Sequence, residues 1–135
     1  MMLNLQKLVH FTIPVKDLDR AEAFYTGLLG LQKIRRNPHM LFLRCGGDHF
    51  VLTHSERPVD PNPPDRHEIH TAFLVAPAGY DAALKTLADH GVRVFLEEDR
   101  QRGTFQGRSA YFHDPDGNVL ELIDLRNDPA SDSGA

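Results

Sequence analysis

Cysteine is nearly absent from the sequence: Cys45 is the only one, so the chain cannot form an internal disulfide. A chain without disulfides suits a reducing compartment, and we predict a cytoplasmic protein. Cys45 ends the apolar run 41–45, where a small core residue is expected rather than a reactive thiolate. The eight histidines are too scattered for a zinc finger, and most are expected on loops.

Two further absences exclude classes of protein. No apolar stretch approaches the roughly 20 residues of a membrane-spanning helix, and residues 1–7 lack the layout of a signal peptide. Dense runs of Lys and Arg are also missing and the formal net charge is −4, which argues against nucleic acid as the main partner. The composition therefore favours a globular protein that acts on a small molecule, with neither nucleic acid nor membrane as a partner.

The two halves of the chain show the same order of predicted elements. Each half has a strand, a helix closed by a glycine (Gly30 or Gly91) and three further strands. His10 aligns with His70, and residues 47–51 align with residues 117–121. The predicted strands span residues 8–15, 32–35, 40–45, 49–54, 69–75, 92–96, 109–113 and 118–125, and the helices span residues 20–30 and 80–90. We therefore predict an α+β fold of two βαβββ modules.

The module boundaries follow from a stretch that breaks all periodicity. Residues 57–66 contain four prolines and must form a loop. We predict one domain over residues 1–126, in which module one (7–56) and module two (68–126) flank a proline-rich linker (57–67). The polar tail 127–135 is expected to be disordered.

The last predicted hairpin contains the residue that needs most explanation. Residues 114–117 read Asp-Pro-Asp-Gly, which is strong turn chemistry between two apolar strands. Glu121 lies between Leu120 and Leu122 in the second of these strands. A carboxylate at such a buried position needs a compensating cation, metal ion or proton.

Strand alternation places three metal-ligating side chains on equivalent faces. His10 and Thr12 share the more polar face of the first strand, and His70 has the equivalent position in the fifth. Glu121 faces away from its apolar neighbours in the last strand. Two imidazoles and one carboxylate leave open positions on a divalent metal, as in non-haem iron oxygenases. We therefore predict that His10, His70 and Glu121 bind a metal.

The chain resembles the vicinal oxygen chelate superfamily, which includes glyoxalases, bleomycin resistance proteins, extradiol dioxygenases and fosfomycin-resistance enzymes. The resemblance extends over residues 7–126 and rests on residues 8–18, 24–31, 68–70 and 111–121. It implies the same three metal ligands, and we prefer Fe(II) or Mn(II), with Zn or Ni as alternatives. It also implies a homodimer whose sites are shared between chains.

Within this family the preferred interpretation is a ring-cleaving, extradiol-type dioxygenase that chelates neighbouring oxygens of its substrate. Tyr111 stands ten residues before Glu121, as in the dioxygenase signature, and Tyr111 and Thr12 would orient substrate oxygens. We assign His49, Arg102 and Arg108 to substrate binding. The loop 100–108, however, lacks the histidine that the same signature carries before its tyrosine.

Three alternatives remain open. A fosfomycin-resistance-type thiol transferase would use the arginines of loop 100–108 to hold a phosphonate. A lactoylglutathione lyase-like enzyme would need a fourth metal ligand where this chain has Val51. A metal-free binding protein of the bleomycin-resistance kind would typically lack the three metal ligands that this chain retains.

Overall fold

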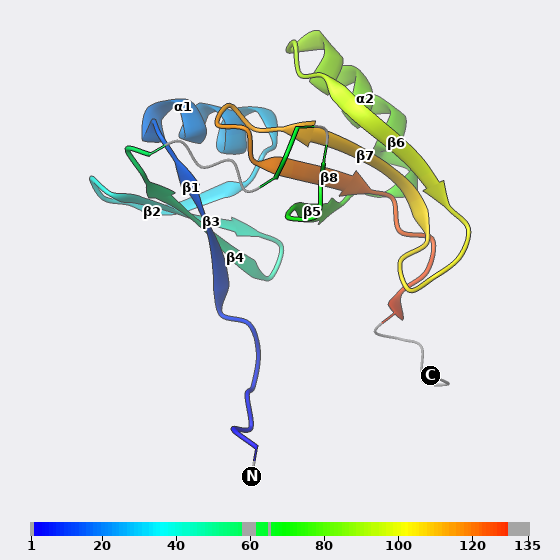
Figure 1. Ribbon diagram of the computed structural model, residues 1–135, viewed down its shortest axis with the longest axis horizontal. Helices are drawn as coiled ribbons and strands as arrows, with labels where there is room; N and C mark the ends of the chain where they lie inside the picture. Colours follow the sequence, from blue (N-terminus) through cyan, green and yellow to red (C-terminus); the bar gives the residue numbers. More distant parts are fainter. Residues whose placement is uncertain (1, 58–61, 65, 130–135) are drawn as a thin grey trace. The chain divides into compact units, whose positions relative to one another are not determined.

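The computed structural model describes residues 2–57, 62–64 and 66–129. Parts of the predicted linker (58–61 and 65) and of the predicted tail (130–135) lie outside the described residues. The chain divides into two compact units, Met1–Val59 and Asp60–Ala135. They contain the predicted modules one and two, and from here on the two names refer to these units. Each module has its own four-stranded sheet (Figure 1).

The two modules have the same topology, so the predicted α+β fold of two βαβββ units is confirmed. The sheet of module one has the strand order β1-β4-β3-β2, and that of module two has the order β5-β8-β7-β6. In each sheet the first strand pairs in parallel with the last, and the other neighbours are antiparallel. The elements are β1 (His10–Val15), α1 (Leu18–Glu22), η1 (Ala23–Leu28), β2 (Gln32–Arg36), β3 (Met40–Cys45), β4 (Asp48–His54), β5 (Thr71–Leu74), η2 (Pro77–Gly79), α2 (Tyr80–Asp89), β6 (Val94–Arg100), β7 (Gly107–His113) and β8 (Val119–Ile123).

The repeat extends to the irregularities of the strands. The pairing of β2 with β3 shifts register between Lys33 and Arg35, and the pairing of β6 with β7 shifts between Val94 and Leu96. A bulge adds a residue to one strand and changes the faces to which the following side chains point. The edge strands of both modules therefore have a bulge at equivalent positions.

The first helix differs from the regular helix that the apolar spacing predicts. Asp17 caps it by accepting from the backbone N–H groups of residues 19 and 20. After Glu22 the helix widens into the π-helical turn η1, in which the N–H of Leu29 donates to the carbonyl of Phe24 at 3.0 Å. The wider turn lets the consecutive residues Phe24 and Tyr25 both be buried.

The faces of the module-one sheet are divided as the strand alternation predicts. Phe11 and Phe50 are paired on β1 and β4, and the Tyr25 ring lies 5.5 Å from the Phe50 ring. The helical segment therefore covers this apolar face, while His10 and Thr12 lie on the other. Two end positions differ from expectation. β1 begins at His10, where its pairing with β4 starts, rather than at residue 8, and Cys45 is exposed at the end of β3 rather than buried.

The turn before β8 is held by one buried aspartate. Asp114 Oδ1 accepts from the N–H groups of Asp116 and Asn118 at 2.8 and 2.9 Å, and Asp114 Oδ2 accepts from Asn118 Nδ2 at 2.8 Å. Gly117 has a φ of +88°, which favours glycine. This turn aligns Tyr111 of β7 with Glu121 of β8.

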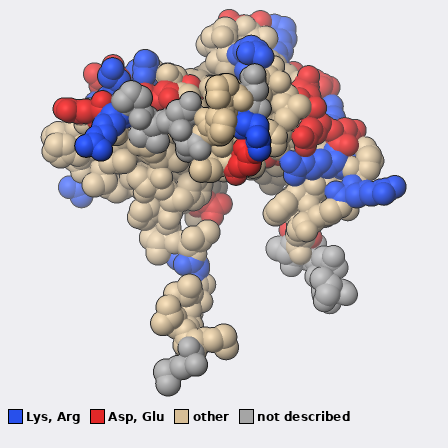
Figure 2. Space-filling model, viewed as in Figure 1, with Lys and Arg blue, Asp and Glu red and all other residues tan. Residues whose placement is uncertain are grey.

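Charged residues of both signs are mixed on the surface. On the face shown in Figure 2, the described Lys and Arg residues lie beside Asp and Glu residues rather than forming a broad basic area. In the part of the chain that the structure describes, no helix has the length and apolar character needed to cross a membrane.

Candidate metal and substrate site

Module two brings His70 and Glu121 together. His70 directly precedes β5, and Glu121 lies in the neighbouring strand β8. Their Nε2 and Oε1 atoms are 3.0 Å apart, and the Glu121 side chain is only 3% exposed, against 27% for His70. The predicted buried carboxylate of Glu121 therefore has the His70 imidazole as the partner of its Oε1 atom.

The second oxygen of Glu121 has its own hydrogen bond. Ser109 Oγ donates to Glu121 Oε2 at 2.6 Å, and both side chains are buried. Ser109 is in β7, and it reaches Glu121 diagonally because its direct partner in β8 is Ile123. A buried carboxylate oxygen without such a donor would lose solvation at a cost of about 1–3 kcal/mol, so Ser109 stabilises and orients Glu121.

The orientation of the His70 ring limits where its proton is. The Nδ1 atom lies 2.6 Å from the carbonyl oxygen of His67. A carbonyl can only accept, so Nδ1 carries the hydrogen and the neutral ring has its lone pair on Nε2. That lone pair faces the acceptor Oε1 of Glu121. A proton or a metal ion is needed between these two atoms, so the pair is built for a cation.

Tyr111 connects this pair to an arginine. Arg100 NH2 donates to the Tyr111 hydroxyl oxygen at 2.7 Å, and Arg100 Nε donates to Glu98 at 3.0 Å. Burial raises the pKa of the Tyr111 phenol to about 12; the negative charge of Glu121 adds to this effect and the positive charge of Arg100 opposes it. Tyr111 is therefore a neutral phenol throughout the physiological range.

His70, Arg100 and Glu121 border a pocket of about 340 Å³ on module two. His70, Glu121 and Arg100 supply its polar groups, and most of the remaining lining is apolar, including Phe105 and Ile123. One cation, one carboxylate and one imidazole thus share a pocket that has room for a small molecule.

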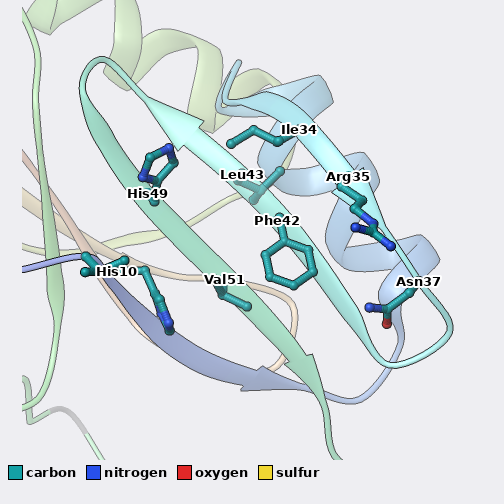
Figure 3. A pocket seen from close by; sticks show the side chains of 9 residues that line it. His10, Ile34, Arg35, Asn37, Phe42, Leu43, His49 and Val51 are labelled. Carbon is teal, nitrogen blue, oxygen red and sulfur yellow. The ribbon is translucent and has the colours of Figure 1, made fainter.

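Module one holds His10, Thr12 and His49, and the two histidines line a pocket of their own. His10, His49 and Val51 line a pocket of about 470 Å³ together with Phe42 (Figure 3). His10 is paired with His49 across β1 and β4, and Thr12 Oγ1 lies 3.1 Å from His10 Nδ1. None of the nine residues that line this pocket is Asp or Glu.

The structure thus groups His70 with Glu121 and Tyr111 in module two, and His10 with Thr12 and His49 in module one. Among residues 2–57, 62–64 and 66–129, no three or more His, Cys, Asp or Glu side chains are grouped closely enough to hold a metal ion. The three-ligand site of His10, His70 and Glu121 therefore stays a prediction.

The two arginines predicted to bind substrate lie outside the module-two pocket. Arg108 donates to Asp124 at 2.7 Å, to Asp81 at 3.2 Å and to the Pro77 carbonyl at 3.1 Å. Its guanidinium also lies 4.3 Å from the centre of the Tyr80 ring. These contacts connect β7 to α2, and they engage the Arg108 guanidinium in the structure of module two rather than in the pocket. Arg102 is exposed in the loop between β6 and β7.

Sequence reasoning missed two residues that the structure places at the site. Arg100 was expected in a loop because β6 was predicted to end at residue 96, but the strand continues to Arg100. Ser109 was not singled out because Glu121 is its diagonal neighbour in β8 and not its direct partner. The turn 114–117 fixes the hairpin register, so the Ser109–Glu121 contact could have been found from the sequence.

Comparisons with known proteins identify the family of the chain. A model of the Glyoxalase/Bleomycin resistance protein/Dioxygenase superfamily matches residues 7–122. The chain is 33% identical over 118 residues to glutathione transferase FosA of Serratia marcescens, covering 87% of this chain and 80% of that protein. It is 30% identical over 118 residues to metallothiol transferase FosB of Shouchella clausii, with coverages of 84% and 76%.

A solved structure provides the same likeness in three dimensions. It is a mutant of the fosfomycin resistance protein FosX of Listeria monocytogenes, complexed with Mn(II) and 1S,2S-dihydroxypropylphosphonic acid. The TM-score is 0.74 at 25% identity, and the match covers 93% of this chain and 94% of that chain.

These relatives correct the expected chemistry: the preferred interpretation as a ring-cleaving dioxygenase is wrong. A biphenyl-2,3-diol 1,2-dioxygenase of Rhodococcus globerulus is 29% identical, but the match covers only 62% of that protein, against 80% and 76% of the two transferases. The spacing of Tyr111 and Glu121 therefore did not discriminate between the two chemistries. The missing histidine in loop 100–108 was the more informative feature.

The raised pKa of Tyr111 leads to a prediction about its ionisation. Since the folded-state pKa is about 12, the neutral phenol persists on raising the pH, and Tyr111 should be less than about a tenth ionised at pH 11. Tyrosinate ultraviolet absorbance of the wild type and of Tyr111→Phe should therefore coincide up to that pH, with circular dichroism as the check for folding. A titration step near pH 10 that disappears in Tyr111→Phe would contradict the burial of the phenol.

Proposed function

Because the chain belongs to the glyoxalase/bleomycin resistance protein/dioxygenase superfamily, we propose that it is a metal-dependent enzyme of the fosfomycin-resistance type. In this proposal it catalyses the attack of a thiol on the epoxide ring of a small phosphonate. The observation that carries the proposal is the His70–Glu121 pair with Arg100 in one pocket. This combination offers a metal-ligating pair beside a cation for a tetrahedral oxyanion.

The donor set fits a divalent metal. With the hydrogen on Nδ1, the lone pair on Nε2 of His70 faces Oε1 of Glu121, so these two atoms offer one nitrogen and one oxygen ligand to a divalent ion. The His67 carbonyl also orients the His70 ring, an outer contact that metal-binding histidines commonly make. His10, His70 and Glu121 would hold the ion, which when bound supplies Lewis-acid stabilisation of the oxygen that leaves the epoxide carbon. Mn(II) is the first choice because the FosX relative contains it, and Fe(II), Zn(II) and Ni(II) are alternatives.

Arg100, Tyr111 and Thr12 have separate roles in the proposed reaction. Arg100 binds the phosphonate, and Tyr111 holds Arg100 through the hydroxyl that accepts from it. Thr12, beside His10, orients a substrate oxygen. The thiol loses its proton to solvent, the thiolate sulfur forms a bond to one epoxide carbon, and the carbon–oxygen bond breaks. The alkoxide takes a proton back from solvent to give a hydroxy thioether.

Turnover should depend on both the metal and the thiol. Protein stripped with a chelator and reloaded with Mn(II) should convert fosfomycin in the presence of glutathione, observed as a new phosphonate signal by phosphorus NMR. His70→Ala and Glu121→Gln should each lower the rate by more than about 100-fold, because loss of outer-shell contacts alone costs 10- to 100-fold. The proposal would be contradicted if the protein showed no turnover with Mn(II), Fe(II), Zn(II) or Ni(II). It would also be contradicted if the metal-stripped protein kept full activity.

Arg100 should determine affinity for the phosphonate. Arg100→Ala removes a charge-assisted contact of about 1.5–3 kcal/mol, so the KM for fosfomycin should rise about 10- to 100-fold while Mn(II) affinity is retained. Arg44→Ala is the matched control, since Arg44 is exposed on β3 and donates to Gln32. A KM that changes in Arg102→Ala but not in Arg100→Ala would restore the assignment made from the sequence alone.

We also propose a homodimer in which the metal site is shared between chains. His10→Ala and Glu121→Gln should each be inactive alone. When equal amounts are unfolded and refolded together, a shared site makes one intact site in each mixed dimer, so about a quarter of the wild-type activity should return for random pairing of a symmetric dimer. Recovery of no activity from mixed dimers that sedimentation shows to be formed would place all three ligands within one chain.

A further inference from the structure

The proline-rich stretch predicted as a linker contains a buried polar residue, Asn62, that the proposed function does not use. Asn62 is only 5% exposed, although prolines precede and follow it in the sequence. Its Nδ2 donates to the carbonyl of Ile69 at 2.7 Å, and its Oδ1 accepts from the N–H of Ile69 at 2.9 Å. One side-chain amide thus satisfies both backbone groups of a residue seven positions later.

We propose that Asn62 is a positioning residue for His70, acting through the backbone of Ile69. The inference rests on the proposed function, since it treats His70 as a metal ligand. Residues 66–70 belong to no helix or strand, and β5 begins only at Thr71. The backbone just before His70 is therefore fixed by the Asn62 amide, which replaces the strand partner that this stretch lacks.

Side-chain burial does not fix this stretch by itself. The Ile69 side chain is 58% exposed, so packing of its apolar surface contributes little to the position of its backbone. The two hydrogen bonds from Asn62 are part-buried, and because Asn62 itself is shielded from water, its amide has little solvent to replace a lost partner. The planar amide also restrains the peptide in orientation, because it binds a donor and an acceptor at once.

The neighbouring residue His67 completes the support. Its carbonyl accepts from His70 Nδ1 at 2.6 Å, and its ring lies 4.5 Å from the ring of Tyr111. The segment that Asn62 holds in place therefore contacts His70 on one side and Tyr111 on the other. A change in the backbone at Ile69 would move the His67 carbonyl relative to His70, and with it the direction of Nε2 toward Glu121.

The expected consequence is on metal affinity rather than on folding alone. Outer contacts that orient a metal-binding histidine typically change affinity 10- to 100-fold when they are removed. Asn62→Ala deletes both hydrogen bonds. Asn62→Asp keeps an acceptor for the Ile69 N–H but places a second oxygen against the Ile69 carbonyl, so it loses one contact and repels at the other.

The experiment measures the Mn(II) dissociation constant by calorimetry on chelator-stripped, folded protein, with the melting temperature of each variant recorded separately. Asn62→Ala should bind Mn(II) about tenfold more weakly than wild type, and Asn62→Asp should also bind more weakly. Asn127→Ala is the matched control. Asn127 makes the same pair of contacts, accepting from Gln106 N–H and donating to the Thr104 carbonyl at 2.9 Å each, but on the loop between β6 and β7.

A merely structural role for Asn62 predicts a different result. In that case Asn62→Ala and Asn127→Ala would both lower the melting temperature, and Mn(II) affinity of the folded protein would be unchanged in both, which would overturn the inference. Should Asn62→Ala fail to fold, the comparison of Asn62→Asp with wild type decides the same question.

A double variant tests the route through His70. In the His70→Ala background, Asn62→Ala should cause no further loss of Mn(II) affinity, because the side chain that it positions is gone. A further tenfold loss there would overturn the inference, since Asn62 would then act elsewhere. A wild type that binds no divalent ion would instead overturn the proposed function, so the two failures are distinguishable.

Discussion

The structure of module two depends on the compensation of one buried charge. Glu121 lies in the central part of a hydrophobic strand, and its polar contacts come from β7 and from the residue that precedes β5. Ser109 of β7 donates to one oxygen, and His70 approaches the other from the start of β5. An uncompensated carboxylate at this depth would cost several kcal/mol, so the strand is compatible with its sequence only while Ser109 donates to one oxygen and a proton or a metal ion lies between the other oxygen and His70. Stability and the capacity to bind a cation are therefore the same constraint at this position.

The internal repeat shows what distinguishes the two modules chemically. The register pairs Phe42 with Val51 in module one and Tyr111 with Glu121 in module two. On their other side, Phe42 and Tyr111 each pair with the first residue after the bulge of the edge strand. The backbone frames are alike, but one frame contains a phenol and a carboxylate where the other has two apolar side chains. His10 and His70 are the equivalent residues that both frames retain. The functional asymmetry therefore comes from side chains at matched positions rather than from a difference in topology.

Local chemistry was sufficient to predict most of the fold. The Asp-Pro-Asp-Gly turn, the alternation around Glu121 and the glycines that close the helices are short-range signals, and they located every strand. The π-helical turn at Ala23–Leu28 was not predictable in this way, because apolar spacing assumes a regular helical period. The arginine of the pocket was missed for a related reason. Whether Arg100 or Arg102 faces the pocket depends on how far β6 extends beyond its bulge, and only the pairing with β7 determines that.

The absence of acidic residues from the module-one pocket has a consequence for how this protein can change. Phe42 and Val51 occupy positions that correspond to Tyr111 and Glu121, yet neither participates in a charge balance. Exchange of these two for other neutral side chains would alter the shape and polarity of that pocket without stranding an ion in the interior. At these two positions module one is constrained by packing alone, whereas the equivalent positions of module two are constrained by packing and by charge balance.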